Sequence, residues 1–173
     1  FLLESGLNGK KMLKLSPLTN EYCIEANKWR LEARETLRTP YMKTDEMQKR
    51  FFEDVVCDPR SNHRYFAVME GKQFIGMGGL CNIEWENGRA EISLIVNPML
   101  QKRGYGKGAV ELLLYEAFSN YRLFIVHGEC YECNIDIGFW KKIAPQNNQI
   151  IIPKRKYWNG NFWRSLYFWW DRP

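Results

Sequence analysis

The stretch QKRGYGKG, residues 101–108, combines three glycines with three cations. It follows a predicted strand, RAEISLIV (89–96), and precedes apolar residues at helical spacing, so we expect a loop that opens a helix. The first turn of a helix has backbone N–H groups without an intrahelical acceptor, and the helix dipole adds partial positive charge there. Glycine has no Cβ, which lets a ligand approach the backbone closely. These residue types therefore suit the binding of a phosphate or pyrophosphate.

The spacing of the glycines is Gly-x-Gly-x-Gly, with Gly104, Gly106 and Gly108 in the three positions. It differs from the G-x-x-x-x-G-K-[ST] of a P-loop and from the G-x-G-x-x-G of a dinucleotide-binding fold. On glycine spacing alone, a tight turn flanked by solvated lysines explains this stretch as well as a phosphate site does.

Periodicity and turn residues predict one α/β or α+β domain that would hold this loop in place. The expected strands are 12–18, 64–70, 73–82, 89–96, 121–130 and the two arms of a hairpin around Asn159-Gly160; the expected helices run from Thr19 or Asn20 through Leu31, over 44–56, from the glycine-rich loop through Phe118, and over 137–143. The order β-α-α-β-β-β-α-β-α-β-β indicates a mixed, mostly antiparallel central sheet with flanking helices. We expect residues 12–173 to form this domain and residues 1–11 to be an upstream extension or a remnant.

The composition, 45% hydrophobic and 26% charged, is typical of a soluble globular protein. No apolar run approaches the roughly 20 residues that a transmembrane helix needs, so we expect no membrane association. The net charge of +5 is spread along the chain, which argues against a nucleic-acid partner. Five cysteines without regular spacing indicate reduced thiols and a cytoplasmic protein.

Cys130 and Cys133 form a C-x-x-C with His127 three residues earlier. A structural zinc site needs four ligands, and the other histidine, His63, is distant in sequence, so we expect no metal. The aromatic residues between Tyr157 and Trp170 could stack on RNA bases, but a hairpin that buries one aromatic face explains them better.

The segment VNPMLQKRGYGKGAVELL resembles the acyl-CoA signature of the GNAT superfamily of N-acetyltransferases, [Gln/Arg]-x-x-Gly-x-[Gly/Ala]. Gln101, Gly104 and Gly106 match its core, and the order of elements over residues 12–170 is similar as well. The resemblance implies the GNAT-like fold and transfer of an acetyl group from acetyl-CoA to a primary amine, by direct attack in a ternary complex. The acceptor would be a small molecule or a peptide, and the protein a monomer or homodimer.

The resemblance also implies the residues that bind coenzyme A. The end of the 89–96 strand, at Ile95 and Val96, would separate from the next strand and pair with the pantetheine arm, and Asn134 would contact that arm unless it only caps a helix. The pyrophosphate would lie against eight residues: Gln101, Lys102, Arg103, Gly104, Tyr105, Gly106, Lys107 and Gly108.

In the family a glutamate on the fourth strand often acts as the general base, and Glu91 stands at that position. A structural ion pair with Arg89 or another cation is an equal alternative. The family's usual general acid, a tyrosine on the helix after strand five, is replaced by Trp140, whose indole N–H cannot deliver a proton. Trp140 could pack on the pantetheine or belong to the core, and Tyr131 or Tyr157 could replace the missing acid.

The acceptor side is the least determined by the sequence. The resemblance places the first helix beside the acceptor, which makes Trp29, Arg30 and Glu32 candidate contacts, although an ordinary exposed helix face explains them equally well. The departure at Trp140 leaves a second possibility open, a non-catalytic acyl-CoA-binding or sensor domain of the same fold.

Overall fold

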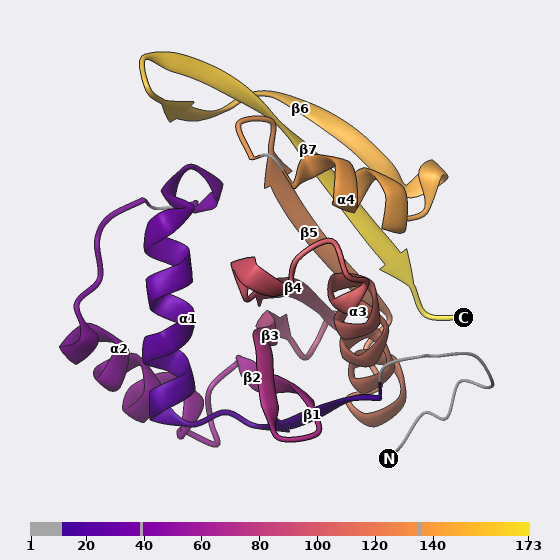
Figure 1. Cartoon of the computed structure of the whole chain (residues 1–173). Coiled ribbons are helices and arrows are strands. Elements are labelled where there is room, and N and C mark those ends of the chain that lie inside the picture. Colours follow the sequence, from indigo (N-terminus) through magenta and orange to yellow (C-terminus); the bar gives the residue numbers. More distant parts are fainter. Residues whose placement is uncertain (1–11, 39, 135) are drawn as a thin grey trace.

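A seven-stranded sheet with the order β1-β2-β3-β4-β5-β7-β6 forms the centre of the computed structural model, which describes residues 12–38, 40–134 and 136–173 (Figure 1). The strands are β1 Leu13–Pro17, β2 Arg64–Glu70, β3 Gln73–Glu84, β4 Arg89–Val96, β5 Ile125–Tyr131, β6 Gln149–Trp158 and β7 Asn161–Asp171. The α-helices are α1 Asn20–Glu32, α2 Asp45–Phe51, α3 Tyr105–Tyr115 and α4 Ile137–Ile143. In the described part of the chain, neighbouring strands pair antiparallel except β4 and β5, which are parallel. The predicted mixed sheet with flanking helices is therefore confirmed.

The helices begin where the sequence places caps. The side chain of Thr19 accepts a hydrogen bond from the Tyr22 N–H at the start of α1, and Thr44 does the same for Met47 at α2. The strand expected over 121–130 begins only at Ile125. Residues 121–124 instead close the end of the preceding helix, where the Leu123 N–H donates to the Ala117 carbonyl.

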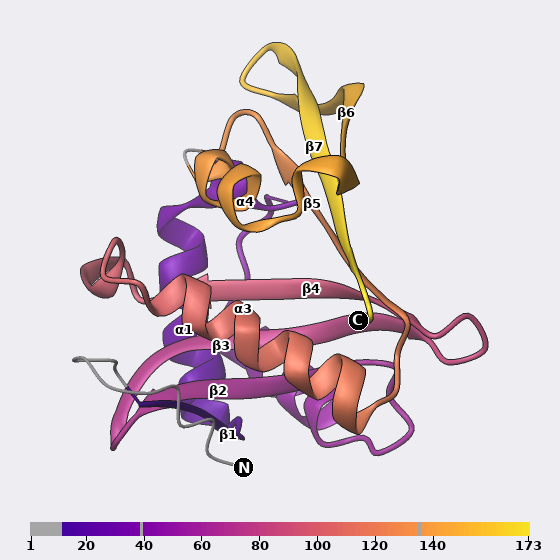
Figure 2. The ribbon, with the colours of Figure 1, turned by 90° about the vertical axis from the view of Figure 1, so that its right-hand side faces the viewer.

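The helices cover both faces of the sheet, with α1 and α2 on one side of β1–β4 and α3 on the other (Figure 2). Side chains alternate between the two faces along a strand. Accordingly, Ala67 and Met69 of β2 pack with Trp29 of α1, whereas Val68 between them packs with Ala109 of α3. The glycine-rich loop that precedes α3 is thereby fixed beside the end of β4.

β4 and β5 pair over only three residues each, from Arg89 opposite Ile125 to Glu91 opposite His127. Beyond Glu91 the two strands diverge, and β5 runs with β7 and β6 into an arm that stands away from β1–β4 (Figure 2). As predicted, the end of β4, which includes Ile95 and Val96, therefore has one edge that β5 does not pair. Such an edge presents backbone N–H and C=O groups to a ligand.

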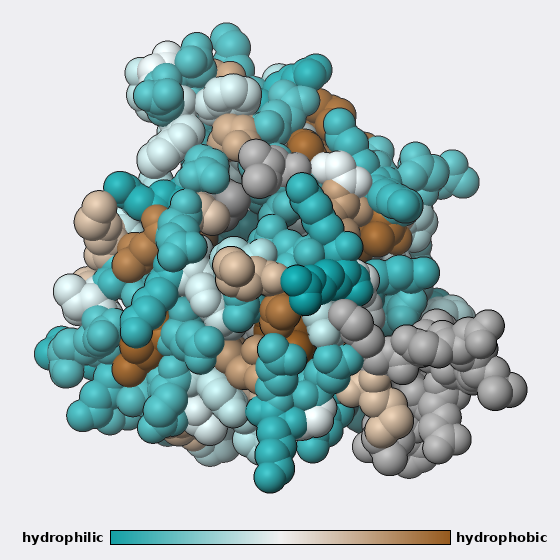
Figure 3. All heavy atoms as spheres, viewed as in Figure 1, coloured by the Kyte–Doolittle hydropathy of each residue, from teal (hydrophilic) through white to brown (hydrophobic). Residues whose placement is uncertain are grey.

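The C-terminal hairpin turns at Asn159-Gly160, both with positive φ (49° and 77°), as the sequence predicts. Its β7 strand buries Leu166 and Phe168, whereas Phe162 near the turn is exposed. The face in Figure 3 is mostly hydrophilic, with apolar side chains scattered over it. Among the described residues, no helix combines the length and the hydropathy needed to cross a membrane.

Candidate active site

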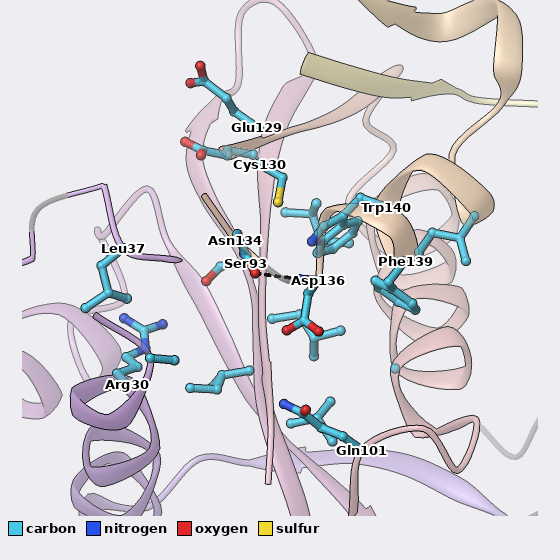
Figure 4. A pocket seen from close by; sticks show the side chains of 18 of the residues that line it. Arg30, Leu37, Ser93, Gln101, Glu129, Cys130, Asn134, Asp136, Phe139 and Trp140 are labelled. Carbon is cyan, nitrogen blue, oxygen red and sulfur yellow. Dashed lines mark hydrogen bonds between the residues drawn. The ribbon is translucent and has the colours of Figure 1, made fainter. Parts of the chain in front are cut away.

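A cavity of about 780 Å³ opens where β4 and β5 separate. One end is lined by the loop before α3 and by α4, and the other by α1 and the segment that follows it (Figure 4). Glu91, the last residue of β4 that pairs with β5, and Tyr131 at the end of β5 also line the cavity. The cavity therefore joins the predicted phosphate site to the predicted catalytic residues.

The three glycines of the loop have different structural roles. Gly104 is the N-cap of α3 with φ 87°, a left-handed conformation that favours glycine, and a Cβ added there would meet open space. A Cβ at Gly106 would lie 3.1 Å from the Phe139 ring, and one at Gly108 would lie 2.8 Å from the Leu13 side chain. Only Gly104 thus combines a backbone requirement with free space in front of the helix.

The start of α3 has the features of an anion site. No side chain caps its first turn, and the backbone N–H groups of Gly106 and Lys107 have no acceptor within the helix because of their position. The side chain of Lys102 reaches the same end of the cavity. Burial raises the pKa of Asp136, and the nearby charge of Lys102 opposes that rise, so a carboxylate also faces this end.

Most of the predicted coenzyme contacts line the cavity. They are Ile95, Val96, Gln101, Lys102, Gly104, Gly106, Lys107, Asn134 and Trp140. Arg103, Tyr105 and Gly108 do not line it. The Tyr105 ring is buried beside Ala109, and its hydroxyl donates to Glu70 Oε2 at 2.6 Å, so only its backbone remains available to a ligand.

Asn134, just before α4, and Trp140, within α4, line the end of the cavity that also holds the glycine-rich loop. The side-chain oxygen Oδ1 of Asn134 accepts a hydrogen bond from the Asp136 N–H at 2.8 Å, so this side chain shapes the turn before α4. The indole of Trp140 stacks on Phe168 with centroids 4.9 Å apart and also faces the cavity (Figure 4). Trp140 therefore packs against the core and also faces the cavity, and its contact with a ligand stays a prediction.

Glu91 forms an ion pair, but with Arg38 and not with Arg89. Arg38 Nη2 lies 2.5 Å from Glu91 Oε1 and Nη1 lies 3.4 Å from Oε2, to which Asn82 Nδ2 also donates at 3.2 Å. Arg89 instead faces Glu84 at 3.7 Å. An ionised carboxylate offers about four lone-pair positions, so three donors leave capacity for one further proton donor.

Tyr131 and Glu129 complete the centre of the cavity from β5. Arg38 interacts with the phenol of Tyr131 as well as with Glu91, and thus links the two predicted catalytic residues. Glu129 has a side chain only 6% exposed. Burial opposes its ionisation, but hydrogen bonds from Arg155 and Ser165 outweigh this and lower its pKa.

At the end beside α1, which is the predicted acceptor end, Trp29 and Arg30 line the cavity, whereas Glu32 is exposed at the end of the helix and does not. Their contact with an acceptor stays a prediction. Sequence reasoning missed Arg38 and Glu129. Glu129 could have been found, because it lies two residues before Tyr131 and so shares its face of the strand. Arg38 belongs to an irregular segment and gives no such signal.

The described residues contain no group of three or more His, Cys, Asp or Glu side chains that could hold a metal ion. Cys130 and Cys133 occupy different surroundings: Cys130 is buried in the core, and the Cys133 thiol faces the Glu35 carbonyl at 3.4 Å.

Solved structures with the same fold include N-acetyltransferases. The spermidine N-acetyltransferase of Vibrio cholerae, in complex with CoA and spermine, has a TM-score of 0.79 at 16% identity and covers 92% of this chain and 95% of its own. RimL, a ribosomal alpha-N-protein acetyltransferase in complex with coenzyme A, has a TM-score of 0.77 at 14% identity, with 92% and 93% covered. At these identities the likeness shows the fold alone.

A comparison of the sequence with models of protein families identifies the family of this chain. Residues 13–138, which include every strand of the β1–β5 half and the glycine-rich loop, match the model of the acetyltransferase (GNAT) domain. The chain therefore belongs to the GNAT family of acetyltransferases.

Proposed function

We propose that this protein transfers the acetyl group of acetyl-CoA to a primary amine by direct attack in a ternary complex. The observation that carries the proposal is the single cavity between β4 and β5, which connects the start of α3 with Glu91. Two substrates that enter from opposite ends of such a cavity would meet at the strand opening. Direct transfer needs this proximity, because it avoids a covalent enzyme intermediate.

In this proposal the N-terminal turn of α3 binds the pyrophosphate of the coenzyme through its backbone N–H groups, with Lys102 and Lys107 adding charge. The unpaired edge of β4 at Ile95 and Val96 accepts the amide-containing pantetheine arm, and Asn134 and Trp140 lie across from it. The thioester then lies near Glu91. Support comes from the chain's GNAT family and from the coenzyme A in the two solved neighbours.

Glu91 acts as the general base. Its remaining lone-pair capacity accepts a proton from the ammonium group of the acceptor, directly or through one water, so that the amine nitrogen can attack the thioester carbonyl. As the carbon–sulfur bond breaks, the new amide nitrogen releases its second proton to solvent, and the leaving thiolate takes a proton from Tyr131 or from solvent. In this proposal the N–H of Trp140, which lines the cavity, donates a hydrogen bond to the reacting groups.

The test separates binding from catalysis. Calorimetry should show that acetyl-CoA binds to the wild-type protein, and a thiol assay over a panel of primary amines should show release of coenzyme A that depends on the amine. Binding without amine-dependent thiol release would overturn the enzyme and favour an acyl-CoA sensor. Absence of binding would overturn the coenzyme site as well.

The fold leaves the acceptor open. The names of the two neighbours assign one to a polyamine and the other to a ribosomal protein, so the same architecture serves very different amines. The acceptor of this chain has to be inferred from its own side chains.

A further inference from the structure

A second, smaller cavity of about 160 Å³ adjoins the acceptor end of the main one. Arg30, Leu37 and Arg38 line both cavities, which makes them neighbours that share one wall. The small cavity is formed by α1 and the segment between α1 and α2. A substituent of the acceptor that extends away from the reacting amine would enter this space.

The described lining of the small cavity contains three cations and no carboxylate. The cations are Arg30, Arg38 and Lys43. Of these, Arg38 is paired with Glu91, while Arg30 and Lys43 form no ion pair with any described residue. Both are half-buried, Lys43 beside the rings of Tyr41 and Phe51. Half-buried cations without a counter-ion attract an anion, because the surrounding protein screens them less than bulk water does.

The two carboxylates at the centre of the main cavity, Glu91 and Glu129, each pair with an arginine. Glu129 is almost fully buried and accepts from Arg155 at 2.7 Å and from Ser165 at 2.6 Å. Glu91 has Arg38 on both oxygens. A polyamine, which carries several positive charges and no negative one, would therefore meet two cations without an ion pair and no carboxylate among the described residues that line the small cavity.

We propose that the acceptor is a primary amine that carries a carboxylate a few bonds from the amine, and that Arg30 and Lys43 bind this carboxylate. The distance between the amine and the carboxylate has to be short, because the small cavity lies next to the proposed reaction site. Arg38 contacts Glu91, where the amine would react, and the same Arg38 lines the small cavity. Two sources share this chemistry: a free amino acid, and a peptide with an acidic residue at or next to its N-terminus. The proposal deepens the proposed N-acetyltransferase activity and rests on it.

The turnover experiment compares acceptors that differ only in the anion. Thiol release from acetyl-CoA is measured with methionine and methionine amide, with the peptides Asp-Phe-amide and Asn-Phe-amide, and with spermidine. We expect the member with the carboxylate in at least one pair to have a KM about tenfold or more below that of its partner, as for a hydrogen-bonded charge pair. The pair that shows the preference identifies the source. Equal use of acid and amide, or better use of spermidine, would overturn the proposal.

Two variants locate the effect. Arg30→Gln and Lys43→Gln should each abolish the preference for the acid while the affinity for coenzyme A stays unchanged. The matched control is Lys28→Gln, which removes an exposed cation from the same helix α1 away from both cavities and should keep the preference. A preference that survives in both cavity variants would overturn the assigned site.

A binding measurement tests the carboxylate site independently of the proposed N-acetyltransferase activity. Calorimetry on protein saturated with coenzyme A compares N-acetylmethionine with its amide, which are a product and its uncharged analogue. Tighter binding of the acid in the wild type, lost in Arg30→Gln, supports the carboxylate site even if no amine is turned over. Indifference to the carboxylate would overturn it even if thiol release succeeds.

Discussion

The guanidinium of Arg38 lies on the carboxylate of Glu91, with Nη2 2.5 Å from Oε1, although 53 positions separate the two residues in the chain. The contact joins the irregular segment after α1 to the middle of the sheet. It places a permanent cation beside the proposed general base and beside the phenol of Tyr131. The proposed catalytic centre is therefore assembled from three separate parts of the sequence.

Glu91→Gln should lower kcat by about 10²- to 10⁴-fold, because the amide cannot accept the proton of the attacking amine. The affinity for acetyl-CoA should not change, since the proposed phosphate site lies at the far end of the cavity. Steady-state thiol release and calorimetry measure the two quantities. The control Glu84→Gln removes a carboxylate from the same sheet outside the cavity and should leave kcat intact. A Glu91 variant with normal kcat would exclude the role as base.

Arg38→Ala should reduce kcat about tenfold or more, because Glu91 loses the guanidinium that pairs with both of its oxygens. We regard Arg38 as a positioning residue, so added guanidine should restore part of the rate. Arg164→Ala removes an exposed cation that pairs with Glu132 outside the cavity and should leave the rate unchanged. Lack of rescue, together with a lower melting temperature, would indicate a purely structural role.

Gly104→Ala should weaken the binding of coenzyme A and also destabilise the fold by roughly 1–2 kcal/mol, the cost of a left-handed conformation for a residue with a Cβ. The matched control is Gly71→Ala, because Gly71 also has positive φ and open space but lies in the β2–β3 turn. Thermal unfolding should report similar losses for both variants, whereas calorimetry should find weaker binding only for Gly104→Ala. Equal coenzyme affinity in both variants would contradict the proposed approach of the pyrophosphate to this residue.

Lys156→Met should destabilise the protein by about 2 kcal/mol or more, because the Lys156 ammonium is buried and donates to the carbonyls of Glu35 and Leu37 at 2.5 and 2.6 Å. These bonds fasten the segment after α1, which carries Arg38, to β6. Chemical denaturation measures the loss, and hydrogen exchange should show faster exchange over residues 34–38. An exposed lysine of the same strand, Lys154, provides the control as Lys154→Met. Unchanged exchange in Lys156→Met would show that the segment is held by other contacts.

The stability of the protein should fall on acidification below about pH 6.5. Burial, assisted by the charge of Arg89, lowers the pKa of His127 from its ordinary value of 6.5. At pH values between this lowered pKa and 6.5, His127 is protonated in the unfolded chain but neutral in the folded protein. The free energy of unfolding therefore rises with pH across this range. Denaturation between about pH 5.5 and 7.5 should show this slope, and His127→Gln should reduce it. The slope should persist in part, because burial also lowers the pKa of His63. An identical slope in the variant would exclude His127 as its source.

Contacts between neighbours in the chain account for the secondary-structure elements and for the glycine-rich loop of the proposed coenzyme site. Thr19 and Thr44 cap the helices that follow them, Asn159-Gly160 forces a hairpin, and Gly104 needs a conformation that only glycine adopts readily. Gln101 and the glycines carry the family pattern in one short stretch. Local hydrogen bonding and backbone conformation are sufficient to explain these features.

The proposed acceptor end depends instead on contacts between distant parts of the chain. Arg38 reaches Glu91, and Lys156 reaches the Glu35 carbonyl 121 positions away, only because the divergence of β4 and β5 brings the α1 segment and the β6–β7 arm around one cavity. Side chains that meet across such distances leave no periodic trace in the sequence. That packing decides which cation pairs with Glu91, Arg89 or another. It also decides which cations stay without an ion pair near the proposed acceptor.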